Sequence, residues 1–401
     1  MMMCRTYIIH GRCRRKKNKR NRRDVLLRPA LCMEVIFLPR ILHMADVHFD
    51  TPFSARFDER QARMRRNEMK NEFSALIRQA AAADLLLIAG DLFDSSYVRE
   101  ETLAFVRRKF DEIPQTEIFI TAGNHDPLSS GVYASLENVH VHVFPKELAY
   151  FDLPELETRV HGISFQEPHM ETLGFTSLDL HPNWCNLLVL HGDITGGGSM
   201  YRPIRMQELA ALGADYIALG HIHKYSGVQR AGGSFYAYPG VWKGRGFDEC
   251  GDSGVLAGMV SKGLAELSFQ PTAGKRFFHL EVSCQPEQSV QELVEQIAEQ
   301  ALSMGGETDF YRVRLSGKRG ANLWNRELWV QEIEDLLLQV QKHFAYLEIE
   351  DDTAVEIPES LIAANPLVRT FAECFEEPPE GEEELYAMAR EIGLEALIEK
   401  A

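Results

Sequence analysis

Residues of the kinds that bind divalent metal ions recur in five short segments between positions 46 and 223. The segments are 46–48 (Asp-Val-His), 90–94 (Gly-Asp-Leu-Phe-Asp), 123–126 (Gly-Asn-His-Asp), 191–193 (His-Gly-Asp) and 220–223 (Gly-His-Ile-His). They offer carboxylate, amide and imidazole donors and no cysteine, a set that suits Mn, Fe or Zn better than a metal that prefers thiolate. Five such segments in order favour a metal centre over chance.

Two metal ions about 3.5–4 Å apart can clamp the attacking and leaving oxygens of an in-line displacement. Such a pair needs a bridging carboxylate, and Asp91, central among the ligands, is the expected bridge. Two divalent cations exceed the charge of Asp46 and Asp91, so the centre would attract a phosphate. His125 is expected to donate a proton rather than to bind metal, since imidazole titrates near neutrality. Asp126 beside it is expected to orient or charge-stabilise that imidazole.

Short apolar runs precede all five segments and predict the strands that position them. The runs are 41–42, 85–89, 117–120, 187–190 and 216–219. Apolar on both faces, they are typical of buried strands in a layered α/β protein. Open α/β sheets carry their sites at the carboxyl ends of such strands. Gly90, Gly123 and Gly220 directly precede ligands, where a close backbone approach would need a missing Cβ.

Together these motifs resemble the calcineurin-like metallophosphoesterase superfamily. Segments 91–94 and 216–223, with Tyr-Pro-Gly at 238–240 and Gly-Arg-Gly-Phe-Asp-Glu-Cys-Gly at 244–251, are similar to its DNA-repair exonuclease branch, the SbcD/YhaO-like nucleases. The resemblance runs from about residue 41 to 269 and is weak beyond. It implies a four-layer α-β-β-α sandwich with a small α/β capping module and a helical C-terminal tail.

The same resemblance implies a ligand set, residue by residue. One ion takes Asp46, His48, Asp91 and His223, and the other takes Asp91, Asn124, His191 and His221. His125 is then the catalytic histidine and Asp94 a carboxylate behind the ligands. Two divalent ions are expected, with manganese first and Mg, Fe or Zn as alternatives.

The resemblance also implies a function, a metal-dependent DNA exonuclease in repair or recombination. An SMC-like ATPase is the expected partner, and a homodimer is a further option. Two other functions stay open. One is a phosphodiesterase or phosphatase acting on a small nucleotide or a phosphoprotein, against which Phe93 and the C-terminal module argue. The other is a DNA-loading subunit of an SMC-like ATPase with little catalysis, against which the complete ligand set argues.

Some of these residues have simpler interpretations. Asp94 is either a site carboxylate or the cap of a helix starting near Ser95. His43 faces the site by strand alternation, yet we interpret it as a structural histidine.

Basic residues supply weak candidates for substrate binding, namely Arg245, Arg56, Arg60 and Arg63. The last three recur with Arg66 and Lys70 at helical spacing, so they would form one basic stripe near the metals. A solvated helix face balanced by acids is the alternative. Arg245 would either hold a phosphate or pair with Asp248 or Glu249.

The chain's 401 residues, 45% of them hydrophobic, allow two or three domains. We expect a metallophosphoesterase domain at 33–272, a capping domain at 273–352 and a helical tail at 353–401. No run approaches the roughly 18 apolar residues of a membrane span. Seven scattered cysteines without metal or redox spacing favour a reducing cytoplasm.

Charge is distributed unevenly along the chain. Residues 1–32 hold eleven Lys or Arg and one acid, a net of +10, so the rest carries −26 of the total of −16. We interpret this basic leader as the product of an upstream start codon, with Met33 as the functional start. A disordered nucleic-acid arm is the alternative. An acidic body is not typical of a protein that coats DNA indiscriminately.

Overall fold

Five short strands, divided between two sheets, precede the ligand segments. They are β1 (Arg40–Met44), β2 (Leu85–Ala89), β3 (Glu117–Thr121), β7 (Cys185–His191) and β8 (Tyr216–Gly220). Every residue of β2, β7 and β8 is buried, as expected of strands covered on both faces. The computed structural model describes residues 38–53, 58–194, 198–306, 308–320, 326–340, 346–379 and 381–399.

The first sheet has the strand order β12-β11-β1-β2-β3-β4. Its other members are β4 (Val141–Val143), β11 (Gly254–Ser261) and β12 (Leu264–Pro271). β1 to β4 are parallel, whereas β11 runs antiparallel to β1, and β12 antiparallel to β11. The residues that follow β1, β2 and β3 therefore emerge at one edge of this sheet.

The second sheet has the order β5-β6-β7-β8-β10-β9. Besides β7 and β8 it contains β5 (Ala149–Leu153), β6 (Thr158–Ile163), β9 (Gln229–Ala231) and β10 (Ser234–Ala237). The four inner strands are parallel and the two edge strands antiparallel to their neighbours. The carboxyl ends of β7 and β8 thus also share one edge.

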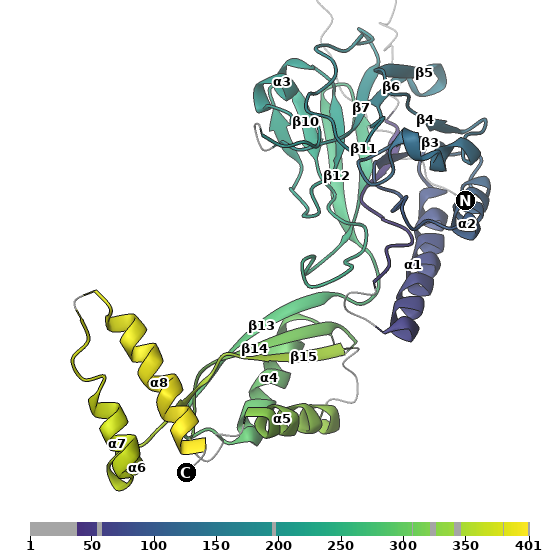
Figure 1. Cartoon of the computed structure of the whole chain (residues 1–401). Helices are drawn as coiled ribbons and strands as arrows, with labels where there is room; N and C mark the ends of the chain where they lie inside the picture. The colour runs from purple at the N-terminus through teal and green to yellow at the C-terminus, as the bar shows by residue number, and fades with distance from the viewer. Residues whose placement is uncertain are drawn as a thin grey trace, which may run out of the picture.

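Helices cover the outer face of each sheet (Figure 1). α1 (Glu59–Ala80) and α2 (Glu100–Asp111) pack on the first sheet, and α3 (Met206–Ala211) packs on the second. Leu87 and Phe119 of the first sheet share a buried cluster with Val189 and Ala218 of the second. The expected four-layer sandwich is confirmed. Three short 3₁₀ helices lie in its loops: η1 (Leu128–Ser130), η2 (Val132–Ser135) and η3 (Pro154–Leu156).

Sequence signals set the start of α1 and the face that it buries. Asp58 accepts a hydrogen bond from the backbone N–H of Gln61, at 2.7 Å, and the Gln61 side chain accepts one from the backbone of Asp58. This capping box satisfies N–H groups that have no partner inside the helix. Apolar residues at helical spacing, including Met69, Phe73 and Ile77, then face the first sheet.

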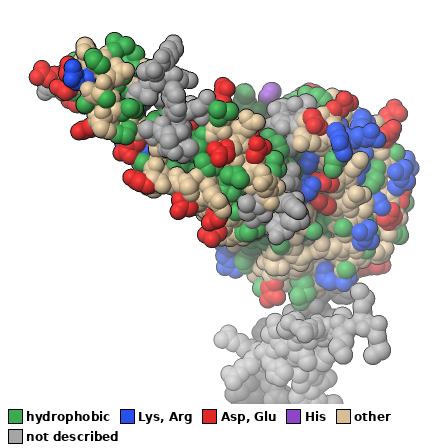
Figure 2. All heavy atoms as spheres, turned by 90° about the horizontal axis from the view of Figure 1, so that it is seen from below, with side chains coloured by type: hydrophobic (Ala, Val, Ile, Leu, Met, Phe, Trp, Pro, Cys, Tyr) green, Lys and Arg blue, Asp and Glu red, His purple; other side chains and the backbone are tan. Residues whose placement is uncertain are grey.

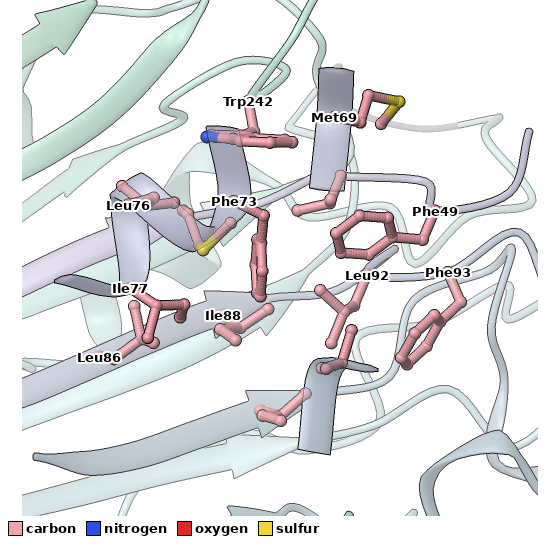
Figure 3. Close-up of a cluster of buried hydrophobic side chains, with 14 of the residues drawn as sticks. Phe49, Met69, Phe73, Leu76, Ile77, Leu86, Ile88, Leu92, Phe93 and Trp242 are labelled. Atoms are coloured by element: carbon pink, nitrogen blue, oxygen red, sulfur yellow. The ribbon is translucent and has the colours of Figure 1, made fainter. Parts of the chain in front are cut away.

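Phe73 lies at the centre of the aromatic cluster between α1 and the first sheet (Figure 3). Its ring centroid is 5.0 Å from that of Phe49 and 5.9 Å from that of Trp242. Truncating a buried phenylalanine to alanine costs about 3–5 kcal/mol. We therefore expect Phe73→Ala to lower the free energy of unfolding by that amount, measured by urea denaturation. Met64→Ala on the exposed face of the same helix should change it by less than about 0.5 kcal/mol, and equal losses would contradict this assignment.

A third, smaller sheet follows in the chain. β13 (Phe277–Cys284), β14 (Phe310–Gly320) and β15 (Tyr346–Asp351) are parallel, and the short β16 (Ala354–Glu356) pairs with the end of β14. α4 (Val290–Met304) and α5 (Arg326–Val340) connect the strands and share a core with them. This strand-helix alternation was expected for the capping module. The domain boundaries themselves remain a prediction.

The last helices form an arm beyond the third sheet (Figure 1). They are α6 (Glu359–Ala364), α7 (Pro366–Glu373) and α8 (Glu383–Glu399). Val368 and Ala372 of α7 pack with Leu394 of α8 in a small cluster. The predicted helical tail is thus present. Figure 2 shows that acidic side chains dominate this arm, whereas Lys and Arg gather on the larger body.

Among the described residues, no helix is both long enough and apolar enough to cross a membrane. The expectations for the basic leader and for Arg56 fall on residues that the structure does not describe.

Candidate metal centre

The five ligand segments meet where the central strands of the two sheets end. Asp46 and Asp91 lie just beyond β1 and β2, and Asn124 beyond β3. His191 is the last residue of β7, and His221 directly follows β8. Because β2 contacts both β7 and β8 across the sandwich, the loops of the two sheets come together at one edge.

The backbone is strained around these ligands. Asp46, His48 and Asp91 have φ of 53°, 50° and 51°, and His221 has φ of 105°. Residues with a side chain seldom adopt this region, and they do so mainly at functional sites. Gly220 is needed for a related reason, because a Cβ there would overlap the backbone oxygen of Ala89. Cβ atoms at Gly90 and Gly123 would likewise overlap the ligands His191 and Asp91.

The first group of donors contains Asp46, His48 and His223, whose donor atoms lie within 4.8 Å of one another. His48 is fully buried and neither of its ring nitrogens has a hydrogen-bond partner. Leaving a buried polar group unsatisfied costs about 1–3 kcal/mol. Burial, followed by the charge of Arg245, holds the pKa of His48 well below its usual range. A neutral, unpartnered imidazole of this kind is suited to bind a metal ion.

The second group contains Asn124, His191 and His221. The Oδ1 atom of Asn124 lies 3.0 Å from Nε2 of His191 and 3.2 Å from Nδ1 of His221. Nδ1 of His191 is 2.8 Å from the backbone oxygen of Ala89, so Nδ1 carries the proton and Nε2 is directed toward Asn124. Three potential ligand atoms therefore point at one another, an arrangement that fits a second cation.

Asp91 lies between the two groups. Its Oδ2 atom is 3.7 Å from Nε2 of His48 and 3.4 Å from Nε2 of His191. Its Oδ1 atom accepts a hydrogen bond from the backbone N–H of His125 at 2.8 Å. The structure therefore brings all seven sequence-predicted ligand residues together, with Asp91 where a bridging carboxylate is needed.

Charges in the site support one another although they are buried. Burial opposes the ionisation of Asp91, but His191 and His48 hold its pKa well below the usual range. Burial raises the pKa of Asp46 to about 6 even though His191 and His223 act in the opposite direction. Burial alone would lower the pKa of His191, but Asp91 and Asp46 raise it to about 9. The carboxylates thus attract positive charge to this place.

His125 reaches the site from the solvent side. Its side chain is exposed, and its ring centroid is 4.8 Å from that of His48. Its carbonyl accepts hydrogen bonds from the backbone N–H of Ser95 at 3.0 Å and from the Ser95 hydroxyl at 2.7 Å. The backbone is held on both sides while the imidazole stays accessible, as a proton donor to a leaving group requires.

The expectation that Asp126 orients His125 is wrong. The Asp126 carboxylate is fully buried and accepts hydrogen bonds from the backbone N–H groups of Phe93 and Gly123, at 2.9 and 2.7 Å, and from the Tyr133 hydroxyl at 2.5 Å. Burial raises its pKa to about 7. Asp126 therefore ties the loop after β3 to the loop after β2 and does not assist the imidazole.

Asp94 does not cap a helix. Residues 95–97 form a turn, and α2 begins at Glu100 with Arg99 as its N-cap. The half-buried Asp94 has its pKa raised by burial, with His125 and Arg245 acting in the opposite direction. It therefore lies within electrostatic reach of the site, and its role behind the ligands stays a prediction.

The remaining candidates are placed as follows. His43 is a structural residue, because its ring nitrogens contact the Tyr216 hydroxyl at 2.8 Å and the Leu219 carbonyl at 3.1 Å. Arg60 and Arg63 are exposed on α1. Arg245 pairs with Glu249, with Nε 3.2 Å from both carboxylate oxygens.

Sequence reasoning missed two residues that support the ligands. Arg202 is fully buried and donates to the carbonyls of His191, Ile163 and Ser164 at 3.2, 3.1 and 3.0 Å. Glu249 contacts Nδ1 of His223 at 2.9 Å. Neither belongs to a metal-binding motif, so only the path of the chain discloses them.

Residues 39–225 match the family described as "Calcineurin-like phosphoesterase". The uncharacterized metallophosphoesterase YhaO of Bacillus subtilis (strain 168) is 29% identical over 57% of this chain and 59% of its own length. The DNA double-strand break repair protein Mre11 of Methanopyrus kandleri is 25% identical over 50% of this chain and 48% of its own. For a subunit of the nuclease SbcCD from Staphylococcus epidermidis the values are 25%, 42% and 53%. Each match spans less than two-thirds of the relative's length.

Proposed function

Because residues 39–225 form a calcineurin-like metallophosphoesterase domain, we propose that this chain is a metal-dependent phosphodiesterase that degrades DNA from its ends in repair or recombination. One observation carries the proposal. The donor atoms of Asp46, Asp91 and His191, from three separate segments, lie within 4.8 Å of one another. Such convergence of buried acids and imidazoles fits a hydrolytic metal centre.

Two ions would be held by the two donor groups. Asp46, His48, Asp91 and His223 would hold one, and Asp91, Asn124, His191 and His221 the other. When bound, divalent cations polarise the phosphate and make a water molecule more acidic. We propose manganese as the native metal, with Mg, Fe or Zn as alternatives. Asp46 and Asp91 leave such a centre with net positive charge, which favours an anionic substrate.

His125 would complete the hydrolysis. Its accessible ring would deliver a proton from a ring nitrogen to the oxygen that leaves phosphorus. The hydrogen bond from its backbone to Asp91 places the ring relative to the bridging carboxylate. Proton donor and reacting phosphate are thereby held in one geometry.

DNA is the proposed substrate for two reasons. Two of the relatives are named as a double-strand break repair protein and a nuclease subunit. In addition, the acidic body leaves only local cationic groups for a nucleic acid, and Arg245 is one of them. Its charge is felt at both Asp46 and Asp91, so we propose that it contacts the phosphate next to the cleaved bond. Arg60 and Arg63 would contact the backbone further along, in a protein that works in the reducing cytoplasm.

The substrate assignment is tested by comparing three substrates after loading with Mn. End-labelled DNA and bis-p-nitrophenyl phosphate, both diesters, should be hydrolysed, and p-nitrophenyl phosphate, a monoester, should react poorly. Preference for the monoester would indicate a phosphatase instead. Diester hydrolysis with intact DNA would indicate a small-nucleotide phosphodiesterase, and absence of bound metal would indicate a DNA-loading subunit.

The tail is proposed to bind an SMC-like ATPase. Leu385, Met388 and Ile392 recur at helical spacing on α8 and are 62%, 58% and 61% exposed. Part of the tail's apolar surface packs within the tail itself, and these residues are left over. An apolar helix face of this kind suits helix-in-groove binding.

We expect the triple change Leu385→Ser, Met388→Ser and Ile392→Ser to abolish co-purification with the ATPase while hydrolysis of bis-p-nitrophenyl phosphate is unchanged. A chain ending after Pro358 should behave alike, because it retains β16 and hence the pairing with β14. Met64→Ser, on an exposed face of α1, is the matched control. Retention of the ATPase by both altered chains would place the partner surface elsewhere.

A further inference from the structure

The loop between β10 and β11 brings a carboxylate to one metal-ligand histidine. Oε1 of Glu249 lies 2.9 Å from Nδ1 of His223. A carboxylate only accepts hydrogen bonds, so Nδ1 must carry the proton and Nε2 keeps its lone pair. Nε2 is the atom that faces Asp46, at 4.0 Å from Oδ1. The proton on one nitrogen thus leaves the other free for a metal ion.

His223 needs such a partner more than the other first-group ligands do. Its side chain is 35% exposed, whereas those of His48 and Asp46 are fully buried. An exposed imidazole can rotate about χ1 and χ2 unless something holds it. His191 in the second group is held by a backbone carbonyl, and among the described ligand histidines His223 is the one paired with a carboxylate.

Glu249 is itself held firmly. The Arg245 guanidinium binds both of its oxygens, and the backbone N–H of Arg245 donates to Oε2 at 2.8 Å. The backbone N–H of Glu249 donates to the Gly246 carbonyl at 3.0 Å. Burial works against its ionisation, but His223 and Arg245 together keep its pKa well below the usual range. The carboxylate is therefore charged and fixed in direction.

The rest of the loop is anchored at points away from the metals. Phe247 is buried, and its ring lies 5.2 Å from that of Phe277, while its carbonyl is 2.9 Å from Nε2 of His279. Lys243 is buried against Glu72 of α1 at 2.7 Å. Contacts with α1 and with β13 thus fix the path of the loop, and with it the position of Glu249.

We infer that Glu249 is a positioning residue, which holds His223 with Nδ1 protonated and Nε2 directed at the ion shared with Asp46 and His48. This inference rests on the proposed two-metal function. Partners behind metal ligands typically contribute 10–100-fold to metal affinity or activity. We therefore expect Glu249→Ala to weaken binding of one of the two ions by about 10–100-fold and to leave the second unchanged.

The experiment uses the full chain and measures metal binding directly. Mn²⁺ titration with elemental analysis gives the stoichiometry and both dissociation constants, and the visible spectrum of the Co²⁺-loaded protein reports the ligand geometry. Glu249→Gln keeps the shape but lacks the negative charge, so its loss of affinity should lie between those of Glu249→Ala and the unaltered chain. Asp248→Ala removes a neighbouring exposed carboxylate and should leave constants and spectrum unaltered.

The outcomes separate this inference from the proposed function. An unaltered chain that takes up no metal would overturn the proposed function. An unaltered chain that binds two ions, with equal affinity and an equal spectrum in both Glu249 variants, would overturn the inference alone. A role confined to loop stability would lower Tm in both variants without moving either dissociation constant, which also overturns it. Should Glu249→Ala not fold, Glu249→Gln decides by the same measurements.

Discussion

Replacing Asp91 by alanine should remove both metal ions and nearly all hydrolysis. The Asp91 carboxylate faces His48 in one donor group and His191 in the other, so both proposed ions lose an anionic ligand at once. A metal ion contributes several kcal/mol of transition-state stabilisation, and each 1.36 kcal/mol is a factor of ten in rate. We expect hydrolysis to fall by about 10³-fold or more, and elemental analysis after Mn loading should find no stoichiometric metal.

Asp46→Ala is the matched comparison. Asp46 lies in the donor group of His48 and His223, and this variant keeps every proposed ligand of the second ion, so it should release one ion and spare the other. Because Asp91→Ala also removes the acceptor for the His125 N–H, Asp91→Asn serves as a second variant that can keep this hydrogen bond. Retention of two ions in both Asp91 variants would show that the bridging assignment is wrong.

The strands and the ligand residues were predictable because their signals are local. A run such as Leu85–Ala89 is apolar on both faces and ends in glycine and aspartate, which together specify a buried strand and the turn after it. The fold then brings the carboxyl ends of five such strands to one edge. The structure accordingly places all seven predicted ligands together.

Asp126 and Glu249 show why other roles were not predictable. Asp126 follows His125 directly, yet its carboxylate binds Tyr133 and backbone groups of two loops. Glu249 contacts His223 only because the loop after β10 folds back over the site. In both cases the partner is chosen by the three-dimensional path of the backbone, and neither a motif nor a periodicity encodes that path.

His125→Ala should slow DNA hydrolysis without loss of metal. The imidazole is exposed, and it is the backbone of His125 that hydrogen-bonds to Asp91, so alanine leaves the ligand loop in place. General acid catalysis is typically worth about 10²–10⁴-fold, and we expect a loss of that order with two Mn ions still bound. Loss of metal instead would identify His125 as a ligand.

The leaving group provides a sharper test of the same role. A DNA alkoxide must be protonated as it departs, whereas p-nitrophenolate is a weak base that leaves without help. His125→Ala should therefore lose much less rate on bis-p-nitrophenyl phosphate than on DNA, and added imidazole should restore part of the DNA rate through the space that the missing side chain leaves. Equal losses on both substrates, with no rescue, would mean that His125 binds or positions the phosphate and does not donate the proton.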